Sequence, residues 1–320
     1  MNRNLKTILF YLLHLIGFVI LFFILRDLDW EAFFREFRTV PVWKYAAGLM
    51  ILIVVYVAKS YRWYMLNRAF QINTTWKDSF VFYLSAGFLS VITPGRLGEF
   101  AKIYFLRKKY HTDMASSTSS VLLDRIWDVL VLSCIAGISL IILVFSEPNL
   151  ISVILISLLF LFSLGVIVFP GILFKPLLFL TRRMINMNES LKGIFLLWKQ
   201  NMFKNFLPAF IISLLAFLGL AFIPCLFSMG TAYGIPYHAG IASISISNIL
   251  SFIPITIAGF GTRELVFTEV WSYFEHPKEV AISVSISYFM VTYLGSLVLG
   301  GIVYLSQMRK LYSIRAIRRL

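Results

Sequence analysis

Long apolar segments, separated by short charged clusters, dominate the pattern along this chain. Six of them approach the ~20 residues that a helix needs to cross the hydrocarbon core of a bilayer. These segments are 7–25, 42–58, 121–145, 151–170, 206–228 and 281–305. Two others are short or interrupted: residues 79–92 end before Pro94, and residues 241–257 contain Pro254. The pattern predicts an all-α polytopic membrane protein.

Composition supports a lipid environment. Of 320 residues, 59% are hydrophobic and only 14% are charged, whereas soluble proteins carry about 25% charged residues. This small number of charged residues cannot cover the core of a soluble protein. Lipid must therefore solvate much of the surface. The net charge of +14 does not indicate nucleic acid, because the basic residues cluster between apolar segments, as in cytoplasmic loops. Membrane lipids with anionic or zwitterionic headgroups are the expected partners.

The positive-inside rule decides what the two weaker segments do. With the basic N-terminus in the cytoplasm, a crossing by 79–92 would place Arg107-Lys108-Lys109 outside. A hairpin that turns back at Pro94-Gly95 keeps this cluster inside. The basic tail 306–320 should also lie in the cytoplasm. This requires residues 241–275 to enter the membrane from the outer face and to return to the same face. We therefore predict six crossings and two re-entrant hairpins from opposite faces, with eight full crossings as the alternative.

The hairpins divide the single transmembrane domain, residues 1–320, into two halves of the same order. Residues 1–145 and 151–305 each contain a crossing, a crossing, a hairpin and a crossing. Because three crossings is an odd number, the second half must be inverted. Inverted repeats with helices broken at mid-membrane are typical of transporters.

The first hairpin contains a break followed by charges. Pro94 and Gly95 interrupt the helix, and Gly98 allows the backbone to approach a neighbour or ligand closely. A helix beginning near Leu97 would direct free N–H groups at the break, a geometry that binds anions. Arg96 would add a planar fork suited to phosphate.

Glu99 lies three residues from both Arg96 and Lys102 and can pair with either. Asp124 and Asp128 share one face of the helix predicted at 121–145, with Arg125 beside them. Charged groups inside a spanning helix usually face the bundle interior. We expect a role inside the protein, for example Arg125 bracing Glu99. An ordinary interfacial position with solvated charges is the alternative for both groups.

The second hairpin repeats the arrangement of a break before an Arg–Glu pair. Pro254, Gly259 and Gly261 precede Arg263 and Glu264, which would face the first hairpin. Thr262 is a candidate N-cap for the following helix. Glu269 is a further candidate residue, although it does not share a face closely with Glu264.

Arg62, in Tyr61-Arg62-Trp63-Tyr64, is either a site residue or a cytoplasmic anchor flanked by interfacial aromatics. The four histidines and two cysteines show no metal-ligand spacing. No nucleophile elbow, P-loop or dinucleotide fingerprint occurs in the sequence. We therefore expect no metal, no cofactor and no enzymatic activity.

Four pieces of sequence, in this order, resemble one family. They are Arg62-Trp63, the segment Pro94 to Glu99, Asp124-Arg125 with Asp128, and the segment Pro254 to Glu264. The set is similar to the transmembrane domain of the lysylphosphatidylglycerol synthase/flippase family, over nearly the whole chain. The resemblance implies movement of a polar headgroup between leaflets. Bifunctional members continue into a soluble aminoacyltransferase domain, and we expect that activity to be missing here.

The resulting interpretation is a lipid translocase for a phospholipid, an aminoacylated lipid or a polyprenyl-linked lipid. The alternative is a non-catalytic membrane partner of a lipid-linked glycosyltransferase or lipid synthase. A glycosyltransferase acting alone is disfavoured because the sequence shows no soluble nucleotide-sugar domain. We expect the cytoplasmic membrane of a prokaryote, with both termini cytoplasmic. A second copy of the chain or a lipid-modifying enzyme could serve as protein partner.

Overall fold

The computed structural model describes residues 22–146, 207–252 and 259–317, except 24, 25, 27 and 231. Most of the predicted segment 7–25, the segment 151–170 and Pro254 lie outside the described residues. The described residues form helices, with no strand among them. In chain order these are α2 (Trp30–Thr39), α3 (Val42–Ala69), α4 (Trp76–Ile92), the 3-10 helix η1 (Pro94–Phe100), α5 (Ala101–Tyr110), α6 (Met114–Ser146), α10 (Leu207–Ser228), α11 (Tyr237–Phe252), α12 (Thr262–Ser272), α13 (Lys278–Phe289), the π-helix η3 (Met290–Leu294) and α14 (Gly295–Ile317).

Within the described parts of the chain, three helical stretches are long and apolar enough to cross a membrane: α3, α10 and the continuous helix Lys278–Gln307. At 1.5 Å per residue, the 28 residues of α3 span about 42 Å, more than the ~30 Å hydrocarbon core. Outward-facing residues of these helices, such as Val54 and Ile302, are more than half exposed and apolar. Three charged residues of α3, Lys44, Lys59 and Arg62, are buried instead. This distribution confirms an all-α protein embedded in the membrane by several helices.

In the sequence, the second apolar segment ends at residue 58, just before Lys59 and Arg62. Helix α3 instead continues to Ala69, and both side chains are buried. The continuation is stable because Trp63 and Leu66, one turn apart, extend the buried face with almost no exposure. The basic residues are therefore part of the helix bundle.

Helices α4 and α5 form a hairpin whose two ends meet. Lys109, in the last turn of α5, lies 2.5 Å from a carboxylate oxygen of Asp78, in the first turn of α4. The hydroxyl of Tyr110 also donates to Asp78 and accepts from the backbone N–H of Thr75 at 3.1 Å. The chain thus returns to the end of the bundle from which it started, as the hairpin interpretation requires.

The turn of this first hairpin is tighter than the sequence suggests. Gly95 and Arg96 both have a left-handed φ of 57°, and the following residues form the 3-10 helix, so α5 begins at Ala101 and not near Leu97. Gly98 lies against the backbone of α4, where an added Cβ would be 2.1 Å from the carbonyl carbon of Leu89. The close approach predicted for Gly98 is therefore to the hairpin's own first helix.

Helices α11 and α12 form the second hairpin. The indole Nε1 of Trp271 donates to Ser243 Oγ at 3.2 Å, and the rings of His238 and Phe274 lie 5.6 Å apart. The prediction that Thr262 caps α12 is wrong, because the N-cap is Gly261. The φ of 83° at this position suits glycine, and the N–H of Gly261 donates to the Glu264 carboxylate at 2.8 Å. Thr262 is the first helical residue and donates to the carbonyl of Gly259.

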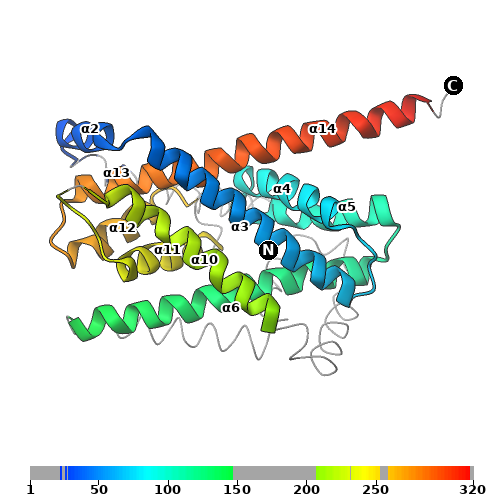
Figure 1. Ribbon diagram of the computed structural model, residues 1–320, viewed down its shortest axis with the longest axis horizontal. Coiled ribbons are helices and arrows are strands. Elements are labelled where there is room, and N and C mark those ends of the chain that lie inside the picture. Colours follow the sequence, from blue (N-terminus) through cyan, green and yellow to red (C-terminus); the bar gives the residue numbers. More distant parts are fainter. Residues whose placement is uncertain are drawn as a thin grey trace, which may run out of the picture.

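Figure 1 shows the two hairpins at opposite ends of the bundle, with α4–α5 to the right and α11–α12 to the left. Helices α3 and α10 pack against each other between them. Helix α4 packs against α14, and α11 packs against α6, so each hairpin is covered by a helix of the other half. The short helix α2, capped by Asp29, packs Phe33 near Ile282 of α13.

Candidate functional site

Seven buried charged residues form one connected cluster, which we call the ion network. They come from α3, from the first hairpin and from α6, and each is at most 9% exposed. The members are Lys59, Arg62, Glu99, Lys102, Asp124, Arg125 and Asp128. Three distant segments of the sequence are therefore held together by charge in the interior of a membrane protein.

Arg62 is the most completely surrounded member of the ion network. Its Nε lies 3.1 Å and its Nη2 lies 2.5 Å from Asp124 Oδ1, and its Nη1 donates to Asp128 at 2.7 Å. It also donates to the hydroxyl of Ser213 on α10 and to the carbonyl of Asp124. Its side chain has no exposed surface, which excludes the interfacial anchor. This fork connects α3, α6 and α10.

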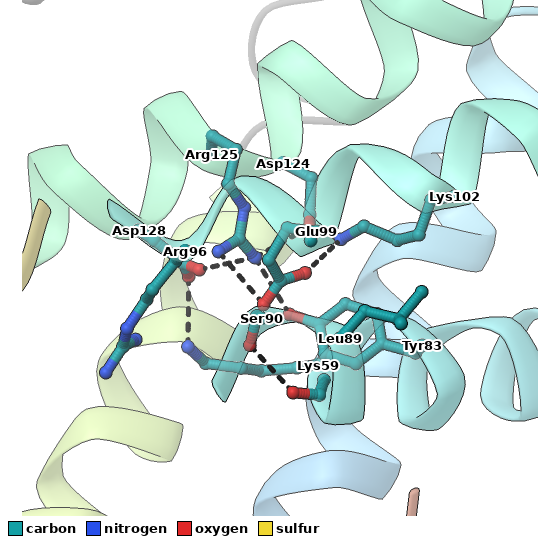
Figure 2. A network of polar contacts seen from close by, with 12 residues as sticks. Lys59, Tyr83, Leu89, Ser90, Arg96, Glu99, Lys102, Asp124, Arg125 and Asp128 are labelled. Carbon is teal, nitrogen blue, oxygen red and sulfur yellow. Dashed lines mark hydrogen bonds and ion pairs between the residues drawn. The ribbon is translucent and has the colours of Figure 1, made fainter. Parts of the chain in front are cut away.

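Arg125 and Lys102 bind the first hairpin to α6. Arg125 Nη1 lies 3.3 Å from Glu99, and its Nη2 contacts Asp124 at 3.1 Å and Asp128 at 2.9 Å. Lys102 bridges Glu99 at 3.0 Å and Asp124 at 2.7 Å. Figure 2 shows Arg125 between these carboxylates. Of the three cations that the sequence suggested for Glu99, the structure thus pairs it with Lys102 and Arg125.

Lys59 belongs to the site although the sequence did not single it out. Its ammonium lies 3.2 Å from Asp128 and 3.9 Å from the centre of the Phe217 ring of α10. The spacing held a usable signal: Lys59 and Arg62 are three residues apart on α3, and Asp124 and Asp128 are four apart on α6. Such pairs place two cations opposite two carboxylates when the helices pack.

Arg96 reaches toward the second half of the chain. Its Nη2 donates to Asn248 of α11 at 2.9 Å and to the hydroxyl of Tyr293 at 3.1 Å. Figure 2 shows its side chain extending away from the carboxylates of the ion network. The tip of the first hairpin is therefore hydrogen-bonded to the second hairpin and to the π-helix η3.

Arg263 and Glu264 form a separate pair at the tip of the second hairpin. The guanidinium donates to the Glu264 carboxylate and, at 2.9 Å, to Ser285 of α13. It also lies over the Tyr293 ring, with 5.5 Å from its central carbon to the ring centre. Glu269 is on the exposed side of α12 and is not brought to either cluster.

A cavity of about 100 Å³ lies between the two hairpin tips and the spanning helices. Its charged lining residues are Lys59, Arg96, Glu99, Arg125 and Asp128. Sites for whole drug-sized ligands are typically about 300–1,000 Å³, so this space fits a small polar group and not a complete lipid. Among the described residues, no three His, Cys, Asp or Glu side chains gather as metal ligands do.

These features define a multi-pass helical membrane protein with a charged cavity between two hairpins. The chain belongs to the family described as the lysylphosphatidylglycerol synthase TM region, whose model matches residues 10–300. The match confirms the resemblance seen in the sequence and assigns the chain to membrane proteins of lipid-related function. No curated protein matches the chain.

Proposed function

We propose that the protein is a lipid translocase, which moves a lipid headgroup between the leaflets of the membrane. One observation carries this proposal: the polar cavity and a large apolar groove lie on the two sides of the same helix–helix seam. The groove has a volume of about 660 Å³ and is lined by α3 and by η3–α14, with Arg38 of α2 in its lining. An amphiphile needs both environments.

The wall between the two spaces is thin. Leu49 lines the groove, and Leu52, one turn along α3, lines the cavity. On the opposite side of the seam, Val291 lines the groove and Thr292 lines the cavity. A lipid with its acyl chains in the groove and its headgroup in the cavity would pass through this seam.

Close packing keeps the seam shut in this structure. A Cβ added to Gly295 would lie 3.0 Å from Leu52 and 3.1 Å from Leu49. The hydroxyl of Tyr56 on α3 donates to Ser296 of α14 at 2.7 Å. One hydrogen bond and small residues are contacts that two helices can make and break at low cost.

The arrangement of helices supports alternating access by an inverted repeat. Each half supplies a hairpin, and the first helix of each hairpin packs on the last helix of the other half. Helix α4 packs on α14, and helix α11 packs on α6. The hairpins lie at opposite ends of the bundle and meet at Arg96 and Asn248. The protein is assigned by this proposal to the cytoplasmic membrane of a prokaryote. The charge pattern of the loops supports the placement of both termini in the cytoplasm.

Reconstitution in vesicles that contain a fluorescent phospholipid tests the proposal. We expect exchange between leaflets faster than in empty vesicles, measured by chemical quenching of the outer leaflet. Gly295→Leu should slow exchange because it fills the seam. Gly137→Leu is the matched control, since no atom lies within 4 Å of a Cβ added to Gly137. Background rates with every lipid class tested would refute the translocase.

Cysteine labelling tests the topology. In a variant without Cys134 and Cys225, single cysteines at Lys108 and Arg318 should both react from the cytoplasmic side. Labelling from opposite sides would contradict the six-crossing arrangement and favour eight crossings.

A further inference from the structure

The long helix Lys278–Gln307 changes its hydrogen bonding at η3, near its middle. Residues 290–294 form the single π-helix among the described residues. At its end, the N–H of Gly295 donates to the carbonyls of Met290 and Thr292, five and three residues back, whereas an α-helical N–H bonds the carbonyl four residues back. One turn of this helix therefore holds an extra residue. Single π-turns inside α-helices are rare and are frequently found at functional sites.

Two hydroxyl groups help to satisfy the backbone of the π-turn. The hydroxyl of Thr292 donates to the carbonyl of Tyr288 at 2.7 Å, and the hydroxyl of Ser296 donates to the carbonyl of Thr292. Such side-chain bonds give partners to backbone groups that an irregular turn leaves free inside a membrane. The same carbonyls accept from backbone N–H groups in a regular α-helix. The π-turn therefore has an alternative conformation that leaves none of these carbonyls unpaired.

The π-turn lies where the cavity and the apolar groove meet. Val291 and Leu294 of η3 line the groove, whereas Thr292 and Tyr293 line the cavity. Each residue of an α-helix advances the chain by about 100° around the helix axis. If the turn took up α-helical bonding, the extra residue would pass into the regular helix and α14 would rotate relative to α13. The residues that face the two spaces would then change.

Helix α3 packs closely on this turn, so a rotation of α14 disturbs the seam. A Cβ added to Gly48 of α3 would lie 3.2 Å from Val291. The hydroxyl of Tyr56 on α3 donates to Ser296 at 2.7 Å. Rotation would carry Ser296 away from Tyr56 and would replace Gly295, which has no side chain, by a larger residue. The seam would therefore separate at the turn whose bonding changes.

Tyr293 connects the π-turn to both hairpin tips. Its hydroxyl accepts from Arg96 at 3.1 Å, and the central carbon of Arg263 lies 5.5 Å from the centre of its ring. The ring also stacks on Phe289, the last residue of α13, with 5.2 Å between the ring centres. A rotation at η3 must break these contacts. The bonding of the turn is therefore tied to the position of the first hairpin tip.

We propose that η3 is the hinge of the translocase. Its π-turn changes to α-helical bonding, α14 rotates, and the seam between the cavity and the groove opens. The proposal rests on the translocase for its purpose, because an opening between these two spaces serves a molecule that passes between them. The hinge itself is a property of the helix, so it is measured without lipid exchange.

Deletion of Met290 removes one residue from the π-turn and should lock the helix in the α-helical form. Because the deleted residue is the extra one, the helix on either side keeps its partners, and the variant should unfold no earlier than wild type. Exchange between leaflets should fall about tenfold or more, since the gating step is lost. Met290→Leu alters the same side chain but keeps the extra residue, so it should slow exchange far less. Wild-type exchange by the folded deletion variant would overturn the hinge and leave the translocase standing.

Deletion of Val298 is the matched control. Val298 and Met290 both line the groove and are both exposed, but Val298 lies in the regular part of α14. Its deletion turns the rest of α14 by about 100°. This turn replaces Gly300 at α4, where an added Cβ would lie 2.8 Å from Phe88 Cβ. The unfolding temperature should fall, and an equal fall on deletion of Met290 would overturn the hinge.

Distances between spin labels test the hinge directly. Cysteines at Val54 of α3 and Ile302 of α14, both exposed, carry the labels in a variant without Cys134 and Cys225. In vesicles, the chain with Met290 should show two distance populations, and deletion of Met290 should leave one. A single population in the chain with Met290 would overturn the hinge even if the deletion variant does not fold. Two populations without exchange of any lipid class would support the hinge and refute the translocase.

Discussion

Both hairpins of this protein place an arginine and a glutamate after a glycine break, but they use the pair differently. In the second hairpin, Arg263 and Glu264 pair with each other and with Ser285. In the first hairpin, Arg96 reaches across to α11 and η3, while Glu99 turns to Lys102 and Arg125. The second arrangement is a closed pair, in which one cation faces one carboxylate of the same hairpin. The first is shared among several helices.

This difference separates stability from binding. A closed pair has no spare charge to offer a ligand, so Arg263 and Glu264 fix the shape of a hairpin tip. A shared network distributes each charge over several partners, so it tolerates the loss of one contact. Four members of the ion network also line the cavity. Four variants, ordered from the largest expected effect to the smallest, test this distinction.

Arg263→Met should cost the most stability, about 3–5 kcal/mol, because it leaves the buried Glu264 carboxylate without a cation. Only the N–H of Gly261 and the hydroxyl of Ser285 would remain. Chemical unfolding in detergent micelles measures the loss. The double variant Arg263→Met/Glu264→Gln should recover at least half of it, and a single-variant cost below about 1 kcal/mol would show that the pair is not closed.

Gly98→Ala should destabilise the first hairpin by about 3 kcal/mol, at the upper end for overpacking, because the backbone of α4 cannot yield to the added Cβ. Gly259→Ala in the second hairpin should cost only about 1–2 kcal/mol, from its left-handed φ of 76°. The nearest atoms to its Cβ lie 3.9 Å away. Thermal unfolding of both variants gives the comparison, and the reverse order would contradict it.

Lys102→Met should cost about 2 kcal/mol, less than Arg263→Met, because Asp124 and Glu99 keep other cations. Lys109→Met is the matched control on the same helix. Lys109 is 53% exposed and pairs with Asp78, so its removal should cost less than about 1 kcal/mol. If Lys102→Met cost as much stability as Arg263→Met, the other cations of the ion network would not compensate for the loss of one member.

The base of the first hairpin should weaken in acid. Burial raises the pKa of the Asp78 carboxyl, but hydrogen bonds from Lys109, Tyr110 and Thr75 outweigh it, and the pKa lies below its ordinary value. A depressed folded-state pKa stabilises the protein above the unfolded-state pKa of about 3.9, and this stability is lost as the pH falls through the folded-state value.

Asp78→Asn should therefore lower the free energy of unfolding by less than about 1 kcal/mol at neutral pH, and the difference from wild type should shrink below about pH 4. The second hairpin is joined at its base by Trp271 and Ser243, which do not titrate. Ser243→Ala should have the same effect at every pH. A pH-independent effect of Asp78→Asn would refute the role of the ion pair between Asp78 and Lys109 at the base of the first hairpin.

Much of this architecture follows from the sequence, because hydropathy and charge act locally. The hairpin at Pro94-Gly95 and the membrane class required only the apolar segments and the basic clusters. Lys59 was missed because an apolar segment is judged by its own residues, whereas the charges that end it are stabilised by Asp128 on another helix. Tyr293 and Ser213 could not be found, since uncharged groups gain their role only from the packing that places them beside arginines.

Tyr293 has a consequence for how the two hairpins communicate. Its hydroxyl accepts from Arg96, and its ring lies against Arg263. The two tips thus share one side chain, and displacement of either arginine alters what the other contacts. Thermodynamic linkage makes such an effect reciprocal: whatever free energy a ligand at Arg96 transmits to the second hairpin, a rearrangement at Arg263 returns to the ligand in equal amount.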